Sequence, residues 1–380
     1  MSERRAHAVI DLAALQQNFR TTHQRSGGRE VIAVIKADAY GHGAVAVARK
    51  LVEAGCRRLA VVTVDEAIEL REAGLTIEIL VLGGLSAGWE AQRVAEYDLC
   101  PVLHHERELP LALEAARRAS RPMGVEIEVD TGMQRMGVAH EEALSLAQAV
   151  HEDPQLTLDG LFTHFSHADQ VEPDVSLRQI ELFRSLIHEL RAGGIEPGSI
   201  HAANSSALHA GQSLIEALPE ATAVRPGLML YGATLAPHED PDRNFVPVMS
   251  VRARVVAIRE VSAGQGVSYG GTWRAPHDTR VATLPIGYAD GVPRNLSNQG
   301  QVWLAGAARP MVGRVSMDYL SVEVGDSAVE VGDWATYFGV SSEGDGGIRV
   351  EEQAEAAGTV AYELLVGVGS RVPREPSSDE

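Results

Sequence analysis

The first two-thirds of the chain alternates between short apolar runs and longer helical patterns, and this alternation restricts the fold more than any other feature. The segments between the runs carry apolar residues at helical spacing, and residues 176–194 end in Gly-Gly, a favoured helix end. Eight runs are typical of buried parallel strands: residues 31–37, 59–64, 77–82, 99–103, 125–129, 158–164, 199–203 and 222–224. Eight strands with interleaved helices predict a (β/α)8 barrel of the TIM type rather than an open sheet.

The character of the sequence changes after Gly232. Residues 234–247 are rich in Pro, Asp and His, which predicts a linker, and short strands punctuated by glycine follow. No long helical pattern returns until residues 350–358. We therefore expect a barrel domain over residues 1–240 and a mainly β C-terminal domain over residues 241–380.

Charge and composition exclude several classes of function. The net charge of −19 argues against nucleic acid or an anionic membrane as the main partner. No apolar run approaches the roughly 18 residues of a membrane span, and the N-terminus lacks the apolar region of a signal peptide. Two cysteines, Cys56 and Cys100, cannot form a disulfide framework, and their spacing does not suit a metal site. These features predict a cytoplasmic globular protein.

The first apolar run ends in Lys36, one of only two lysines in the chain. Lysine is seldom buried, so a structural cation at a strand end is the simpler interpretation in a lysine-rich protein. This chain uses arginine for nearly all its other cations. Arginine cannot form a Schiff base, whereas a primary amine with a lowered pKa can. The pattern therefore favours a covalent role for Lys36, while Lys50 reads as a solvated helix charge.

Other unusual polar residues follow later strands, at the barrel edge where catalytic groups lie. A small hydroxyl, backbone amides and glycine after the last two strands suit a phosphate site, and together with Lys36 they indicate pyridoxal phosphate (PLP). His164 and His167 form a weak metal pattern without a carboxylate or cysteine partner, so we expect no metal. The residues at the strand ends are Asp130, Arg135, His164, Asn204, Ser205, Arg225 and Gly227.

The segment VIAVIKADAYGHG, residues 31–43, resembles the PLP-lysine signature of alanine racemases. The likeness continues in order through VDTGMQRMG, GLFTHFSHAD, HAANSSA, VRPGLMLYG, VSYGGTW, LPIGYADG, VGRVSMDYL, TVAYELL and SRVPR. It covers nearly the whole chain, and ten ordered motifs are far more specific than any one of them. The resemblance implies a PLP-dependent enzyme of fold type III that interconverts L- and D-alanine, forms a homodimer with shared active sites and supplies D-alanine for peptidoglycan.

The resemblance also implies roles for individual residues. Lys36 would hold PLP, Arg225 would face its pyridine nitrogen, and His164 would lie between Arg225 and Tyr269. Tyr269 would reach the active site of the other subunit of a head-to-tail dimer. Further cofactor contacts would come from Tyr40, Asn204, Ser205, Gly227, Leu228 and Tyr362, and substrate contacts from Arg135, Tyr288, Met317 and Asp318.

These implied roles agree with the chemistry of racemisation. A proton must leave one face of the α-carbon and another must return to the opposite face, so two bases, Lys36 and Tyr269, are better than one. A phenol has an ordinary pKa of about 10 and needs cationic neighbours or a histidine partner to act as a base. Arg225 would keep the pyridine nitrogen unprotonated and so weaken the electron sink, which limits side reactions.

The chain departs from the family pattern at Glu128. Many members carry a carbamylated lysine there, beside the substrate-binding arginine. We hypothesise that the Glu128 carboxylate supplies the same negative charge beside Arg135 without the modification. Gln134 and Ser316 also differ from common forms, which leaves the substrate range open.

Three other functions remain alternatives. The first is a racemase of broader or different specificity, acting on serine or basic amino acids. The second is a PLP-dependent decarboxylase of the same architecture, which Arg225 and Tyr269 argue against. The third is a non-enzymatic PLP-carrier protein. Such a protein would have a single domain, so the additional β domain argues against this alternative.

Overall fold

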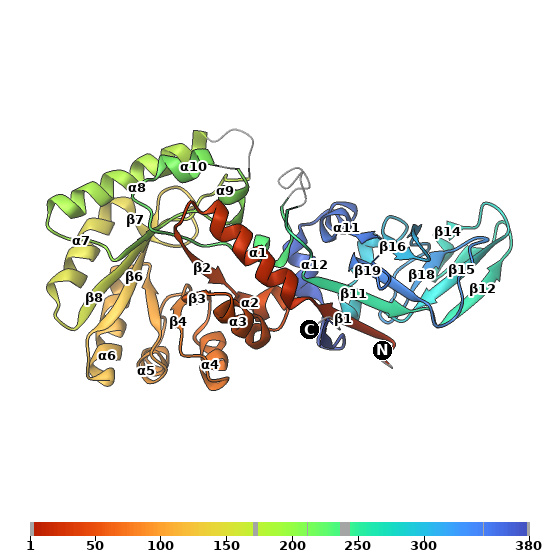
Figure 1. Ribbon diagram of the computed structural model, residues 1–380, viewed down its shortest axis with the longest axis horizontal. Coiled ribbons are helices and arrows are strands. Elements are labelled where there is room, and N and C mark those ends of the chain that lie inside the picture. Colours follow the sequence, from red (N-terminus) through yellow and green to blue (C-terminus); the bar gives the residue numbers. More distant parts are fainter. Residues whose placement is uncertain (1–3, 170–173, 211, 236–243, 345, 378–380) are drawn as a thin grey trace. The chain divides into compact units, whose positions relative to one another are not determined.

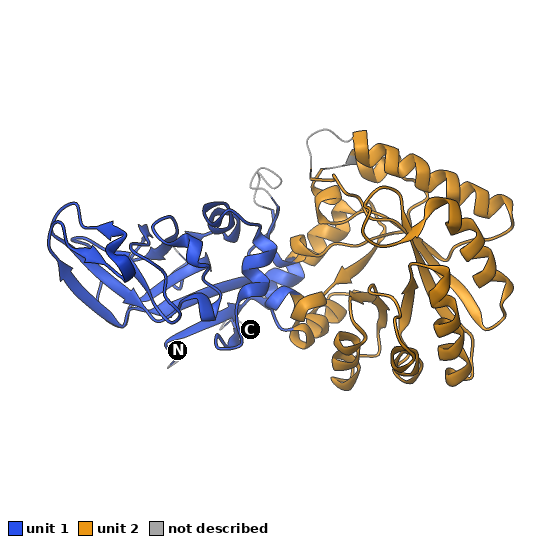
Figure 2. Cartoon of the chain, turned by 180° about the vertical axis from the view of Figure 1, so that it is seen from behind, with its two compact units in different colours: residues 1–17, 40–43, 231–380 blue, residues 18–39, 44–230 orange. Residues whose placement is uncertain are grey.

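The computed structural model describes residues 4–169, 174–210, 212–235, 244–344 and 346–377. The chain divides into two compact units, coloured separately in Figure 2. We call residues 18–39 and 44–230 the barrel unit, and residues 1–17, 40–43 and 231–380 the β-rich unit. Most of the predicted linker, residues 236–243, lies outside the described residues.

The barrel unit is organised around a closed sheet of eight parallel strands. Each predicted apolar run corresponds to one of them. Around the ring they are β2 (Glu30–Val34), β3 (Arg58–Val61), β4 (Glu78–Val81), β5 (Cys100–Leu103), β6 (Met123–Asp130), β8 (Leu156–Phe162), β9 (Ser199–His201) and β10 (Ala223–Val224). The short strand β7 (Val138–Ala139) pairs with β6 outside this ring.

Helices surround these strands, and Figure 1 shows α4 to α8 on the outside of the sheet. Residues of β3 and β5 are buried along their whole length, which explains why these strands read as continuous apolar runs. The helices are α1 (Leu12–Arg25), α3 (Ala44–Glu53), α4 (Val64–Glu72), α5 (Gly88–Glu96), α6 (Leu109–Ala119), α7 (His140–Glu152), α8 (Asp174–Ala192), α9 (Ser205–His209) and α10 (Gln212–Ala217).

Strand β6 alternates between apolar and acidic residues, and the acidic side chains point into the barrel. Glu126 bonds to Arg58 of β3 and to His201 of β9, neither of which neighbours β6 in the sheet. Successive side chains of a strand point to opposite faces, so Glu128 shares this inner face. The barrel interior therefore contains charges and is not filled by apolar side chains alone.

The β-rich unit contains two larger sheets and a two-stranded hairpin, β13 (Gly266–Val267) with β14 (Trp273–Arg274). The three-stranded sheet is β12 (Ala257–Val261), β15 (Thr279–Leu284) and β18 (Leu320–Glu323). The seven-stranded sheet is β17 (Ala307–Pro310), β16 (Gln301–Leu304), β19 (Trp334–Val340), β11 (Met249–Arg254), β1 (Ala6–Ile10) and β21 (Arg374–Pro376), with β20 (Gly347–Ile348) paired to β19. Helices α11 (Val350–Ala357) and α12 (Ala361–Gly367) complete the unit.

The prediction of a (β/α)8 barrel followed by a mainly β region is confirmed. Strand β1, for which the sequence gives no clear signal, pairs antiparallel with β11 and parallel with β21 in the β-rich unit. Among the described residues, no helix is both long enough and apolar enough to cross a membrane.

Candidate active site

Lys36 lies just past the carboxyl end of β2, at the start of a short left-handed helical turn, α2 (Lys36–Gly41). Residues 37–40 all have φ values of 53–54°, and Gly41 follows with 80°. Left-handed backbone costs roughly 1–2 kcal/mol for each residue other than glycine. The sequence predicts a polar turn at this place, but not its handedness.

Two carboxylates hold this unusual turn in place. Glu66 accepts a hydrogen bond from the backbone N–H of Ala37 at 2.7 Å, and Asp38 accepts one from the N–H of Ala44 at 2.6 Å. The second oxygen of Glu66 accepts the N–H groups of Val62 and Thr63 at 2.8 and 3.1 Å. Asp38 therefore ties the turn after Lys36 to the start of α3, and Glu66 ties it to the start of α4.

The surroundings of Lys36 lower its pKa from the ordinary value. Burial is the largest cause, and the positive charges of Arg135 and Arg225 act in the same direction, whereas Glu66 and Glu128 oppose them. A lowered pKa makes the neutral, nucleophilic amine more available. Arg135 itself is exposed, on the loop after β6.

Arg225 follows β10, and its buried guanidinium is held from several sides. It donates to the carbonyl oxygens of Thr163 at 2.8 Å and His201 at 3.2 Å, and it lies over the Phe162 ring at 4.4 Å. Its Nη2 is 3.3 Å from Nδ1 of His164. Burial lowers the pKa of Arg225 to about 10, so it stays protonated at neutral pH.

His164 lies at the carboxyl end of β8, between Arg225 and Asn204. Its Nε2 is 3.5 Å from the Asn204 amide nitrogen. Burial and the positive charges of Arg225 and Arg135 lower the pKa of His164 to about 3. The imidazole is therefore neutral, and Nδ1 can accept a hydrogen bond from the guanidinium N–H.

The Ser205 hydroxyl forms the centre of a small cradle after β9 and β10. Its oxygen accepts the backbone N–H groups of Gly227 at 3.0 Å and Met229 at 3.3 Å. Leu228 lies between these two donors in sequence, and Asn204 caps α9 by accepting the N–H of Ala207 at 3.0 Å. The cradle gathers a hydroxyl and the amides of Gly227 and Met229, the kinds of group that bind phosphate in many barrels.

Glu128 points from β6 toward a buried histidine. Its Oε2 is 3.0 Å from Nε2 of His104, whose backbone N–H donates to Glu108 at 2.9 Å. Burial opposes ionisation of this histidine, yet Glu108 and Glu128 raise its pKa to about 9. Burial would raise the pKa of Glu128, but the hydrogen bond and charge of His104 hold it below the ordinary value. Both groups are therefore charged at neutral pH.

Two further predicted cofactor residues belong to the β-rich unit. The rings of Tyr40 and Tyr362 are 5.7 Å apart, and Tyr40 also packs against Tyr231 at 4.9 Å. His42 stacks on the same Tyr231 ring at 4.5 Å. This cluster fixes the end of the left-handed turn that begins at Lys36.

Three loops of the β-rich unit carry the remaining predicted residues. Tyr288 donates its backbone N–H to Ser316 at 3.0 Å, and the next residue bonds to the Met317 carbonyl at 3.1 Å. The hydroxyl of Ser268, next to Tyr269, donates to the Arg314 carbonyl at 2.7 Å. The side chains of Tyr269, Tyr288 and Met317 are 71%, 45% and 52% exposed.

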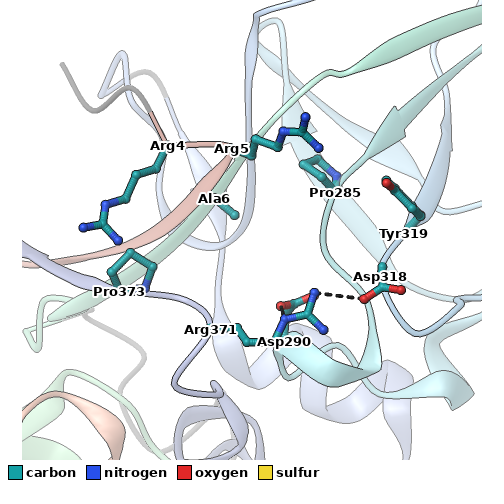
Figure 3. A pocket seen from close by; sticks show the side chains of 9 residues that line it. All are labelled: Arg4, Arg5, Ala6, Pro285, Asp290, Asp318, Tyr319, Arg371 and Pro373. Atoms are coloured by element: carbon teal, nitrogen blue, oxygen red, sulfur yellow. Dashed lines mark hydrogen bonds and ion pairs between the residues drawn. The ribbon is translucent and has the colours of Figure 1, made fainter.

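Asp318, the last predicted substrate contact, pairs with Arg371 in the same unit. Arg371 is 2.9 Å from Asp318 and 3.3 Å from Asp290, and Figure 3 shows it beside both acids in a surface pocket that Arg4 and Arg5 also line. The ion pairs link the loop that carries Met317 to the C-terminal segment.

The structure thus brings together the predicted residues within each unit. Lys36, Glu128, Arg135, His164 and Arg225 interact electrostatically in the barrel unit. Reasoning from the sequence missed four residues that hold this group: Glu66, His104, Glu126 and His201. Charged residues at alternate positions of an otherwise buried strand were a usable signal for Glu126. Within the described part of the chain, no cluster of three or more His, Cys, Asp or Glu residues could hold a metal ion.

Comparisons with known proteins agree along the full length. A family model for the N-terminal domain of alanine racemase matches residues 10–235, and one for its C-terminal domain matches residues 248–376. The alanine racemase of Mycobacterium ulcerans is 41% identical over 376 residues, which cover 97% of this chain and 94% of that relative.

Solved structures show the same relationship. Alanine racemase from a D-cycloserine-producing Streptomyces lavendulae is similar with a TM-score of 0.92 and 34% identity, covering 100% of this chain and 98% of that one. The Bartonella henselae alanine racemase with covalently bound pyridoxal phosphate gives a TM-score of 0.86 and 28% identity, covering 98% and 100%. The chain belongs to the alanine racemase family of isomerases.

Proposed function

We propose that this chain interconverts L- and D-alanine with PLP bound at Lys36. The observation that carries the proposal is the position of Lys36: a half-buried amine of lowered pKa, fixed by a left-handed turn at the carboxyl edge of the barrel. Membership of the alanine racemase family supports the choice of alanine, and the relative from B. henselae supports PLP as the cofactor.

The residues on the barrel edge fit this cofactor. PLP carries an aldehyde, a phosphate and a pyridine nitrogen, and each has a suitable partner here. Lys36 offers the amine, the Ser205 cradle with Gly227 and Leu228 offers a hydroxyl and amides, and Arg225 offers a fixed N–H donor. Tyr40, Asn204 and Tyr362 would complete the contacts around the phosphate.

PLP would supply an electron sink that makes the α-proton of the bound amino acid more acidic. Arg225 would keep its N–H directed at the ring nitrogen, because the guanidinium holds its proton at neutral pH. His164 would in turn hold one guanidinium nitrogen through Nδ1. Such a donor leaves the ring nitrogen without a full proton and so limits competing reactions.

Two side chains would move the protons. Lys36 Nζ would take or return the proton on one face of the α-carbon. The phenol oxygen of Tyr269 from a second subunit would serve the other face. One group takes a proton from the α-carbon while the other returns one, so L-alanine becomes D-alanine and the reverse reaction exchanges the roles.

A homodimer would supply Tyr269. In the β-rich unit, Tyr269, Tyr288 and Met317 expose large side chains on loops that hydrogen bonds connect. Such exposed apolar groups are typical of a surface that another molecule covers. We infer that a second copy covers them, with Tyr288, Met317 and Asp318 lining the entrance to the partner's site and Arg135 binding the substrate carboxylate.

The proposal for Glu128 is that its carboxylate acts on Arg135 in place of a carbamylated lysine. Its ionised state, held by His104, and its burial beside the positive charges of Arg225 and His104 support this role. We further place the enzyme in the cytoplasm, where its product would supply peptidoglycan synthesis. Rescue of a D-alanine auxotroph by the cloned chain would test this role.

The test of the proposed function uses the purified full-length chain. After incubation with PLP and removal of the excess, we expect a visible absorption band and, after borohydride reduction, a pyridoxyl group on the Lys36 peptide. L-alanine should yield D-alanine in an assay coupled to D-amino acid oxidase, faster than serine, lysine or arginine reacts. Lys36→Ala should lose both the band and the activity, whereas the matched control Lys50→Ala should keep both.

Other outcomes would favour the alternatives. Faster turnover of serine or a basic amino acid would indicate a racemase of different specificity. A labelled Lys36 without racemisation of any amino acid would indicate a PLP carrier. A colourless protein, or a cofactor attached elsewhere, would contradict the proposal.

A further inference from the structure

A chain of charged hydrogen bonds crosses the interior of the barrel and ends on Arg225. Glu78, at the amino end of β4, is 2.7 Å from Nη2 of Arg58. The same nitrogen is 2.5 Å from Oε1 of Glu126. Oε2 of Glu126 is 3.0 Å from Nε2 of His201, whose Nδ1 is 2.5 Å from Nη1 of Arg225.

The residues in the middle of this hydrogen-bond chain are not exposed to water. Glu126 and His201 are 0% exposed, and Arg58 and Arg225 are buried. Burying charges costs several kcal/mol of desolvation for each ion, and apolar side chains of similar size are often at least as stabilising. Stability alone is therefore a weak reason for these charges in the barrel interior.

The barrel wall is built to admit the Glu126 side chain. Gly160 of β8 lies directly opposite Glu126 in the strand pairing, and a Cβ at position 160 would overlap its carboxyl group. The pairing of β6 with β8 also shifts between Val125 and Glu126, which leaves Asp159 unpaired. Both features place the carboxylate between Arg58 and His201.

The ionisation states fix where the imidazole proton must be. Burial would raise the pKa of Glu126, but His201 and Arg58 lower it, so the carboxylate can only accept hydrogen bonds. Burial lowers the pKa of His201, which is therefore neutral and carries one proton. Because Nε2 faces an acceptor and Nδ1 faces the N–H donors of Arg225, the proton belongs on Nε2.

We infer that Glu126 is a positioning residue for Arg225, acting through the tautomer of His201. By accepting the Nε2 proton, Glu126 leaves the lone pair of Nδ1 free to accept from Nη1 of Arg225 and hold the guanidinium in its place. The opposite tautomer would direct an N–H at the guanidinium N–H groups. The effect on the cofactor rests on the proposed function, whereas the tautomer of His201 does not.

Glu126→Gln tests this inference because an amide cannot accept from both neighbours. If its oxygen keeps Arg58, its NH2 faces His201, which must then move its proton to Nδ1. Histidine-selective ¹⁵N NMR of the full-length holoenzyme, with the His201 signals assigned by His201→Gln, reports which nitrogen carries the proton. We expect Nε2–H in the wild type and Nδ1–H, or a mixture, in Glu126→Gln.

Glu126→Gln should also leave the Arg225 guanidinium less firmly held. We expect kcat for alanine to fall about 10- to 100-fold, the usual range for losing a partner that orients a site residue, with a smaller change in KM. The dissociation constant for PLP should rise several-fold at the same time. Glu78→Gln is the matched control, because it removes a carboxylate from the same Arg58 at the exposed end of the chain and should leave the His201 tautomer and kcat unchanged.

Gly160→Ala provides a second route to the same result. The added methyl group displaces the Glu126 carboxyl without changing its charge, so both readouts should move in the direction of Glu126→Gln. If Glu126→Gln fails to fold, this variant decides the question.

The inference is overturned if the wild type carries the proton on Nδ1, or if the folded variants keep both the wild-type tautomer and wild-type kcat. A merely structural role would lower the melting temperature without moving the imidazole proton. If the wild type neither binds PLP nor racemises alanine, the proposed function fails whatever the tautomer is.

Discussion

The two groups of predicted site residues differ in how completely their own unit surrounds them. In the barrel unit, Arg225 is only 4% exposed and each side of its guanidinium meets a named partner. In the β-rich unit, Tyr269 is 71% exposed, and its loop is held at the neighbouring Ser268, whose hydroxyl donates to the Arg314 carbonyl. Arg225 is enclosed by residues of its own chain, whereas Tyr269 is exposed on the surface of its unit.

The difference shows which site residues have their pKa values shifted by other residues of the same chain. Burial and neighbouring charges lower the pKa of Lys36 and that of His164 in the barrel unit. Tyr269, by contrast, lies exposed on a loop of the β-rich unit. In the proposed dimer, Tyr269 gains cationic neighbours only when it enters the partner's site, so its activation depends on assembly.

The largest effect that tests this contrast is expected for Tyr269→Phe. Loss of the phenol proton carrier should lower kcat about 10²- to 10⁴-fold, the range for a general acid or base. The melting temperature should stay close to that of the wild type, because the side chain is exposed. The measurement is racemisation of L- and D-alanine in deuterated water, followed by deuterium incorporation at the α-carbon.

Tyr97→Phe is the control, since it removes a tyrosine hydroxyl that bonds to Glu72 on the surface of the barrel unit. Tyr97→Phe should leave the rates of racemisation of both L- and D-alanine unchanged. A Tyr269→Phe enzyme within threefold of the wild type would exclude the phenol as a base.

Much of the fold could be predicted because each barrel strand contains several apolar residues and lies between helical patterns. Strand β1 could not, because its partners β11 and β21 lie more than 200 residues away in sequence. The handedness of the turn after Lys36 could not be predicted either, since nothing local in Ala37 or Ala39 favours positive φ. Glu66 supports the turn from another helix.

The site was predicted where a residue's role follows from its motif, and missed where it follows from a partner across the barrel. Arg225 and Ser205 belong to recognisable motifs. His201 lies in the motif HAANSSA, but its function depends on Glu126 from a different strand. Alternation of acidic and apolar residues usually indicates a strand with one wet face, and in β6 the acidic face instead lines a closed interior.

The next largest effect is expected in the stability of His104→Gln, which loses the buried ion pair between His104 and Glu128. The pKa of His104 is raised to about 9 in the folded protein, against an ordinary value of about 6.5, so the stabilisation is complete below pH 6.5 and disappears as pH rises through 9. The difference can reach about 3 kcal/mol. Melting temperatures of wild type and His104→Gln should therefore differ more at pH 6 than at pH 9.5.

The exposed His277 offers the control for this experiment. His277→Gln should melt like the wild type at both pH values. A gap between wild type and His104→Gln that grows with pH would show that the imidazole is neutral in the folded state.

The smallest of these effects is expected for Glu128→Gln. Loss of the carboxylate charge that we propose to act on Arg135 should raise KM for alanine about tenfold, the change that 1.4 kcal/mol produces, and kcat should change less. Mass spectrometry of the wild type should show no carbamate adduct. The exposed Glu141→Gln is the control, and an unchanged KM in Glu128→Gln would remove Glu128 from substrate binding.

The most direct test of the central claim, a site shared between two copies of the chain, mixes two inactive variants. Lys36→Ala and Tyr269→Phe are purified separately, mixed in equal amounts, dissociated and reassembled. Half of the dimers should then pair one variant with the other, and each mixed dimer should hold one site with both Lys36 and Tyr269 intact. We predict recovery of about a quarter of wild-type activity; no recovery from mixtures that demonstrably exchange subunits would contradict the account.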